Sequence, residues 1–181
     1  NTPFRLYKQN QHEGGISSPL IVHWPEGLKT KPGSITRQPG HLIDFMATFI
    51  ELSGAKYPKQ VGERAIEPLE GKSLLPIFQG GERDGHENLY FHFGTDRALR
   101  QGKWKLVSAK GGKWELYDLE KDRTELNDLS AKYSDRVNEM STLWFDIAKN
   151  KERLGKKGLS PVKSTLKKIS FRKDTSGQLK E

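Results

Sequence analysis

The chain has 181 residues, of which 33% are hydrophobic and 30% are charged, and its formal net charge is +8. This length allows one domain or a domain and a half, and the low hydrophobic share predicts that part of the chain lies outside any core. The absence of cysteine excludes disulfides and cysteine-based metal sites, and no stretch approaches the roughly 20 apolar residues of a membrane span.

The first predicted elements are a strand and a helix. An apolar run between two prolines, residues 19–25, predicts a buried parallel strand. After a polar loop, the spacing of apolar residues over about 41–53 predicts a helix that ends at Gly54. Residues 55–73 have the composition of an irregular segment, and a short helical turn is expected at 73–78.

An antiparallel meander is expected next. Alternating apolar and polar residues predict four strands near 89–93, 98–100, 103–107 and 113–119. The dipeptide Gly111-Gly112 indicates a hairpin between the last two strands. A charged turn over 120–128 and a helix over about 130–149, with one apolar face, complete this part of the chain.

The positive charge is concentrated at the C-terminal end. Residues 150–181 hold ten Lys and Arg residues against three Asp and Glu residues, whereas the preceding 149 residues are almost neutral. With weak periodicity and no clear caps, residues 150–181 are expected to form a basic tail that is extended or disordered. Its single aromatic residue, Phe171, provides no platform on which bases could stack.

These elements divide the chain into three expected parts. Residues 1–83 are expected to be the end of an α/β domain. Residues 84–149 are expected to form an α+β subdomain, in which a C-terminal helix packs on a three- or four-stranded antiparallel sheet. We expect residues 84–149 to fold best. The first part should need further strands or self-association, because a parallel strand is normally covered on both faces. Since the chain starts at Asn1 without a leader, we expect a mature product or a piece of a longer protein.

Lys8 is the first candidate functional residue. It lies five residues before Glu13-Gly14-Gly15, on a loop that leads into the expected strand, and active-site loops of α/β enzymes are often built this way. Its ammonium group could contact an anionic substrate, or it could be an ordinary solvated lysine. The carboxylate of Glu13 is better explained as a group that ties the loop down beside two flexible glycines.

His12 is the second candidate. It could donate to a substrate oxygen, although a lone histidine without a visible partner is more often structural. His23 lies within the expected strand and is interpreted as a core histidine, and no pair of histidines has metal-ligand spacing. The acidic residues of 118–125 lack the glycine of a calcium-binding loop and indicate a charged turn. No phosphate-binding glycine loop, zincin motif or nucleophile elbow is present.

Four blocks of the sequence resemble the C-terminal third of a type I sulfatase of the arylsulfatase kind, a family with the alkaline-phosphatase-like fold. They are PFRLYKQNQHEGGISSPLIVHWP at 3–25, HLIDFMATFIELSG at 41–54, LEGKSLLP at 69–76, and the KWKL and ELYDL segments within 97–129. The blocks follow the order of the family and cover about residues 1–149. The second block departs from the family pattern at Ala47, where the family often has proline.

The resemblance implies roles for the candidate residues. Lys8 matches the family lysine that contacts the sulfate and stabilises charge during S–O cleavage, whereas His12 falls on a variable position. The formylglycine nucleophile and the calcium ligands of the family match nothing in this chain and are expected upstream. We therefore expect the full-length protein to be a calcium-dependent sulfuric ester hydrolase and the isolated chain to be inactive.

The substrate implied by the resemblance is a sulfated small molecule or glycan, and export of such family members implies a periplasmic or secreted location. Two alternatives stay open. A phosphodiesterase or phosphonate hydrolase of the same superfamily would carry a threonine nucleophile instead of a Cys- or Ser-derived one. A non-enzymatic module would bind a polyanion through the basic tail, although the near-neutral charge of 1–149 argues against a dedicated nucleic-acid fold.

Overall fold

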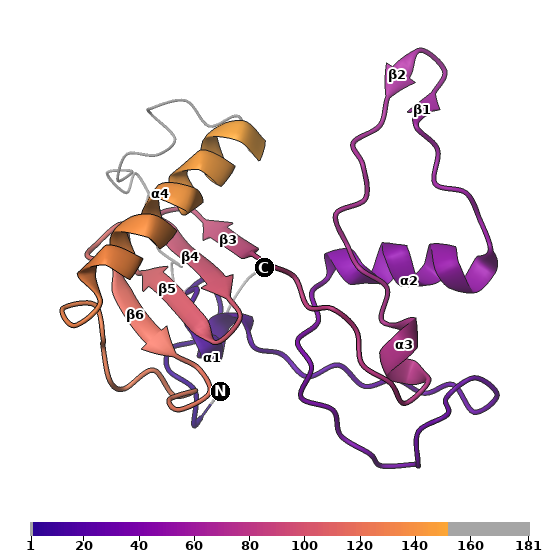
Figure 1. The fold of residues 1–181 in the computed structure, drawn as a ribbon, viewed down its shortest axis with the longest axis horizontal. Coiled ribbons are helices and arrows are strands. Elements are labelled where there is room, and N and C mark those ends of the chain that lie inside the picture. The colour runs from indigo at the N-terminus through magenta and orange to yellow at the C-terminus, as the bar shows by residue number, and fades with distance from the viewer. Residues whose placement is uncertain (1, 152–181) are drawn as a thin grey trace, which may run out of the picture.

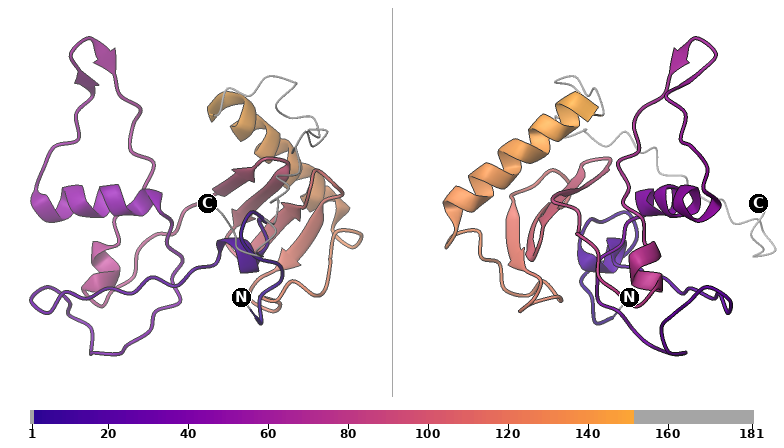
Figure 2. Two further views of the ribbon diagram at one scale, coloured as in Figure 1. Left: turned by 180° about the vertical axis from the view of Figure 1, so that it is seen from behind. Right: turned by 45° about the vertical axis from the view of Figure 1, so that its right-hand side comes forward.

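The computed structural model describes residues 2–151 and consists of a sheet with its helices and an extended segment beside it. Helix α4 (Ser134–Lys151) covers one face of a four-stranded sheet. The short helix α1 (Glu13–Ile16) lies on the opposite face (Figures 1 and 2). Helix α2 (Ile43–Ser53), helix α3 (Leu75–Phe78) and a small hairpin lie away from the sheet.

The sheet confirms the predicted meander. Its strands run in the order β3-β4-β5-β6, and every neighbouring pair is antiparallel. Their bounds are Leu89–Phe93 for β3, Asp96–Gln101 for β4, Trp104–Ser108 for β5 and Glu115–Asp118 for β6. Gly102, with φ of 53°, makes the tight turn between β4 and β5 that a residue with a side chain would resist.

The main core lies between this sheet and α4. Leu99, Leu106 and Leu116 are fully buried on one face of three successive strands. Met140, Trp144 and Ala148 of α4 recur every four residues and pack against them. The indole Nε1 of Trp144 donates to the Phe91 carbonyl at 3.2 Å, so its N–H group is hydrogen-bonded although the side chain is buried. Among residues 2–151, no helix combines the length and the apolar character that crossing a bilayer requires.

Helix α2 forms where its spacing predicts and ends at Gly54 in the left-handed conformation, with φ of 65°. The small hairpin was not predicted: β1 (Gln60–Val61) pairs with β2 (Arg64–Ala65) around Gly62. The expected helical turn is α3, and the Leu75 N–H donates to the Ser73 hydroxyl just before it.

A buried carboxylate, Asp44, holds this segment together. It accepts hydrogen bonds from Arg83 at 2.8 Å and from His86 at 2.6 Å, and from the backbone N–H groups of Lys72 and His41 at 2.9 and 2.8 Å. Burial by itself would raise the pKa of Asp44, but these four donors outweigh it and lower the pKa to about 2. One turn later, the buried Thr48 hydroxyl accepts from the Leu74 N–H at 2.8 Å.

Two predictions about the N-terminal part are wrong. Residues 19–25 form no strand, and Leu20 and Ile21 are 52% and 88% exposed, because no strand among residues 2–151 lies beside them to pair with. His23 is accordingly exposed and is not a core histidine. The apolar stripe of α2 is likewise uncovered: Leu42, Met46 and Phe49 are all more than half exposed.

On the second face of the sheet, a buried ammonium group joins distant parts of the chain. Lys105 of β5 has its Nζ 2.9 Å from Glu13 Oε1 and 2.8 Å from Glu125 Oε1, and all three side chains are at most 3% exposed. Glu125 also accepts the Glu13 backbone N–H at 2.7 Å, and Arg123 lies 3.3 Å from the other Glu13 oxygen. These contacts fix α1 on the sheet.

The Asp44 carboxylate predicts a specific loss of stability in acid. Since its pKa is lower in the folded chain than in the unfolded chain, its contribution of about 2 kcal/mol is complete above pH 4 and disappears as the pH falls towards 2. Asp44→Asn should therefore lower the free energy of unfolding at pH 7, and the difference from wild type should shrink at pH 2.5. Urea unfolding at both pH values measures this, with exposed Asp84→Asn as the control. A deficit that does not vary with pH contradicts the assignment.

Removing the buried ammonium predicts a large loss of stability. In Lys105→Met, Glu13 and Glu125 lose the cation between them and only Glu13 keeps one, Arg123, so the free energy of unfolding should fall by about 3–5 kcal/mol. Lys103→Met is the matched control, because Lys103 is half-exposed and lies 3.5 Å from Asp118; its loss should stay below about 1 kcal/mol. Urea denaturation of both variants compares them, and equal losses would show that the buried cluster is not stabilising.

Candidate functional site

The candidate site centres on residues 5–12, here called the Lys8 loop. The Lys8 side chain is exposed, whereas Gln11 and His12 at the end of the loop are buried. Leu6 and Gln9 on either side of Lys8 have positive φ values of 61° and 78°. Backbone of this kind is unfavourable for residues with side chains and persists only where the surroundings impose it. The loop is therefore held in shape by contacts outside itself.

Two glycines allow the first of these contacts. A side chain on Gly14 would overlap the carbonyls of Arg5 and Leu6, and one on Gly15 would overlap the carbonyls of Tyr7 and Asn10. Because both residues lack a side chain, α1 packs directly on the backbone of the Lys8 loop, and the Gly14 N–H donates to Arg5 O at 2.9 Å. The Glu13-Gly14-Gly15 sequence thus positions the loop, as the structural interpretation of Glu13 predicted.

The second set of contacts joins both ends of the loop to one carboxylate of strand β6. Glu115 Oε2 lies 2.7 Å from Arg5 Nη1 and 3.2 Å from His12 Nε2. The Tyr117 hydroxyl donates to the same oxygen at 2.5 Å and accepts from Arg5 at 2.6 Å. These contacts connect residues on the two sides of the boundary expected near residue 84.

The environment keeps Glu115 ionised and Tyr117 protonated. Burial alone would raise the pKa of Glu115, but the hydrogen bonds from Tyr117 and His12 and the charge of Arg5 outweigh it, so this pKa lies below its ordinary value. Burial, followed by the hydrogen bond to Glu115, raises the pKa of Tyr117. Glu13 has its pKa lowered, since the charge and hydrogen bond of Lys105 exceed the opposing effect of burial.

The two candidate residues, Lys8 and His12, therefore lie in different environments. Lys8 presents its ammonium group at the surface, where a substrate can reach it. His12 is 1% exposed and contacts Glu115 through Nε2, while its buried Nδ1 has no hydrogen-bond partner within the described part of the chain. This geometry supports a structural contact for His12, and its participation in chemistry stays a prediction.

Three residues that hold the loop, Arg5, Glu115 and Tyr117, were not selected as functional from the sequence. All three occur in the quoted motifs, Arg5 within PFR and the other two within ELYDL. Among residues 2–151, no three His, Asp or Glu side chains are grouped so that they could hold a metal ion.

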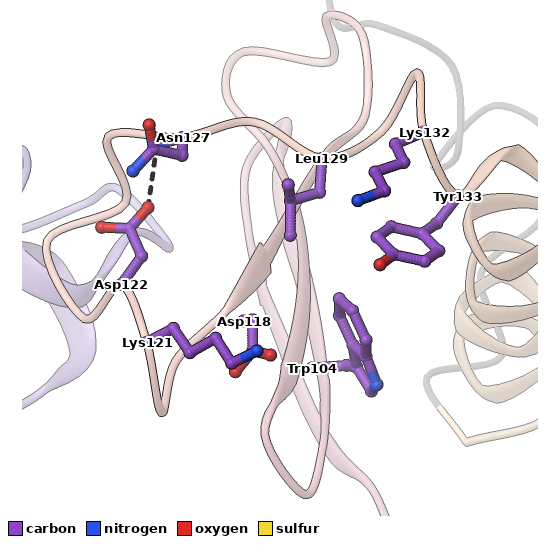
Figure 3. Close-up of a pocket in the computed structure, with 8 residues that line it drawn as sticks. All are labelled: Trp104, Asp118, Lys121, Asp122, Asn127, Leu129, Lys132 and Tyr133. Atoms are coloured by element: carbon purple, nitrogen blue, oxygen red, sulfur yellow. Dashed lines mark hydrogen bonds between the residues drawn. The ribbon is translucent and has the colours of Figure 1, made fainter.

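A shallow hollow of about 230 Å³ lies elsewhere, between strand β5 and the start of α4 (Figure 3). Trp104 and Tyr133 form part of its wall, and their rings meet edge to face at 5.2 Å. The Arg136 guanidinium lies 5.2 Å and the Lys103 ammonium 5.4 Å from the centre of the Trp104 ring. With its neighbours packed so closely, the indole offers little open surface for a ligand to stack on, and Lys8 does not line this hollow.

Residues 4–152 match the family model described as N-sulphoglucosamine sulphohydrolase, C-terminal. The chain is 34% identical to mouse (Mus musculus) steryl-sulfatase over 109 residues, which cover 60% of this chain and 16% of that protein. It is 36% identical to a sulfatase of Formosa agariphila over 95 residues, which cover 51% of this chain and 16% of that protein.

Among solved structures, the chain resembles the crystal structure of Ps i-CgsB with a TM-score of 0.65 and 26% identity. The match covers 81% of this chain and 32% of that one. Ps i-CgsB has also been crystallised in complex with k-i-k-neocarrahexaose. The chain thus spans about a sixth of the length of the curated relatives and a third of the solved one. Because the family model covers residues 4–152, most of the chain, this chain belongs to the sulfatase family and corresponds to its C-terminal portion.

Proposed function

We propose that the full-length protein containing this chain hydrolyses sulfate esters, and that this chain contributes Lys8 as a contact to the sulfate group. The observation that carries the proposal is the setting of Lys8: an exposed ammonium group on a loop whose two ends are fixed to one strand of the sheet. Membership in the sulfatase family supports the reaction class.

The role proposed for Lys8 is electrostatic. When an S–O bond of a sulfate ester breaks, negative charge develops on the departing and non-bridging oxygens. A lysine ammonium group held in place before the reaction stabilises that charge without having to reorganise. Contacts with neighbouring segments hold the backbone around Lys8 in an otherwise unfavourable conformation. Such a rigid backbone is what pre-organisation of the ammonium group requires.

The nucleophile and the metal are assigned to the rest of the protein. We propose that it supplies a formylglycine and a calcium site, because the nucleophile motif of the family matches nothing in this sequence and residues 2–151 hold no cluster of acidic or histidine metal ligands. The uncovered apolar side chains of α2 and of residues 20–21 support the presence of a further packing partner, since large contiguous apolar surfaces usually mark interfaces.

The proposed substrate class is a sulfated glycan. Similarity to Ps i-CgsB, which was crystallised with k-i-k-neocarrahexaose, supports a saccharide. Hydrolysis of a phosphate diester or a phosphonate by the same scaffold is the competing outcome, and comparison of kcat/KM for matched sulfate and phosphate esters separates the two.

Replacement of Lys8 tests the proposal directly. In the full-length protein, Lys8→Ala should lower kcat for an aryl sulfate by about 10²–10³-fold, the usual cost of removing one group that stabilises transition-state charge. Lys8→Arg should retain part of the activity, because it keeps the charge but not the shape. Exposed Lys113→Ala is the control and should change kcat less than twofold. Unchanged kcat and KM in Lys8→Ala would overturn the assignment.

The division of the site predicts that residues 1–181 alone are inactive. Single-turnover assays with an aryl sulfate, at enzyme concentrations above that of the substrate, should release no more sulfate than a buffer blank. Circular dichroism should show at the same time that the sheet and α4 are folded. Sulfate release that scales with the concentration of the chain would show that a complete site lies within it.

A further inference from the structure

We propose that Glu115 is a positioning residue for Lys8: one of its carboxylate oxygens closes the Lys8 loop, so that the C-terminal sheet sets where the ammonium group lies. This inference rests on the proposed function of Lys8 and extends it to strand β6, more than 100 residues further along the chain.

Both ends of the loop contact one carboxylate oxygen of the sheet, in addition to the backbone hydrogen bond from Gly14 to Arg5. Glu115 Oε2 contacts Arg5 at 2.7 Å and His12 at 3.2 Å, and these are the first and last residues of the loop. An eight-residue loop whose ends meet at one oxygen has few ways to move without breaking a charged contact. Removing the charge should therefore let the loop relax, and Lys8 lies near its middle.

The strain around Lys8 points the same way. Leu6 and Gln9 adopt left-handed backbone conformations, which cost energy and relax when the restraints that impose them are lost. Within the loop itself, Asn10 donates to the Tyr7 carbonyl through its backbone N–H and through its side chain, both at 3.1 Å. These local bonds shape the turn, but they do not fix it to the sheet.

The contacts of Glu115 point to the loop more than to the core. Its strand is already fixed by pairing with β5, and the Leu116 N–H donates to Asp128 at 3.0 Å. Glu115 Oε2 accepts three hydrogen bonds, and two of the donors, Arg5 and His12, belong to the loop. The third donor, Tyr117, is also bonded to the loop, because its hydroxyl accepts a hydrogen bond from Arg5. Replacing Glu115 by glutamine keeps the size of the side chain, so the sheet should survive the change.

The other anchor of this region has a different function. The Lys105 cluster holds Glu13, which lies after the loop, and so fixes α1 on the sheet. Glu125 of this cluster accepts a longer hydrogen bond from Arg5 through its backbone carbonyl, at 3.4 Å, and no contact that the structure gives joins the cluster to residues 6–11. Glu115 is thus the residue whose loss should affect the loop with the least effect on the remainder of the fold.

A double-mutant cycle in the full-length protein tests the inference. Glu115→Gln should lower kcat for an aryl sulfate by about 10- to 100-fold, the scale expected when a charge-stabilising group is misplaced by about 1 Å. KM should change much less. In the Lys8→Ala background the same substitution should change kcat less than twofold, because no ammonium group is left to misplace.

Asp118→Asn is the matched control. Asp118 lies on the same strand and carries the same charge, but it faces Lys103 at 3.5 Å and not the Lys8 loop. It should change kcat less than twofold in either background. If Glu115→Gln does not fold, Tyr117→Phe serves instead: it removes one donor to Glu115 Oε2 and should lower kcat about threefold, again only when Lys8 is present.

The outcomes are distinguishable. If Lys8→Ala lowers kcat but Glu115→Gln costs the same factor with and without Lys8, the positioning role is overturned and the proposed function stands. If Glu115→Gln matches Asp118→Asn, the positioning role is also overturned. If Lys8→Ala leaves kcat unchanged, both the proposed function and this inference fail.

Discussion

The arrangement of this chain depends on a buried ammonium group between two carboxylates. An unpaired lysine at the position of Lys105 would cost several kcal/mol, because its charge is removed from water on the covered face of the sheet. Glu13 and Glu125 compensate that charge from segments before and after the sheet in sequence. Each segment would lose a buried charged contact if it left, so the cluster, together with the contacts of Arg5 and His12 to Glu115, holds the N-terminal residues on the sheet.

Glycines allow close backbone contact at two places where distant segments of the chain meet. Gly14 and Gly15 admit α1 to the backbone of the Lys8 loop, and Gly71 admits its segment to the Ile43 carbonyl at the start of α2. In each case a buried carboxylate lies next to the crossing, Glu13 in one and Asp44 in the other. The shared principle is that backbone contact brings the segments together and a buried, fully paired acid fixes their relative position. The family motifs around these glycines thus describe packing as much as chemistry.

The sequence predicted the four-stranded sheet and its helices, but it missed the short β1–β2 hairpin and predicted a strand at 19–25 that does not form. Hairpins join β3, β4, β5 and β6 in order, so alternation and turn residues were sufficient for the sheet. Residues 19–25 have the composition of a buried strand, but a strand forms only beside another, and residues 2–151 provide none there. Lys105 and Glu125 could not be identified as a buried pair, because charges in a strand and in a turn are normally solvated. The partner that Lys105 binds from the N-terminal segment, Glu13, lies 92 residues away in the sequence.

Polar and apolar contacts show which surfaces of this chain are satisfied within it and which remain exposed. Around Asp44 and Thr48 the polar groups of α2 are buried and satisfied, while the apolar stripe of the same helix faces outward. The polar contacts of α2 are made within this chain, whereas its exposed leucine, methionine and phenylalanine form a surface on which a further partner can pack. The Lys8 loop shows the opposite balance, because both of its ends are anchored within the chain. The position of the ammonium group is therefore fixed before any further partner is added, whereas the surface around α2 awaits one. In the site proposed for Lys8, one charged wall would therefore be preformed within this chain, and the exposed face of α2 is where a larger partner would pack.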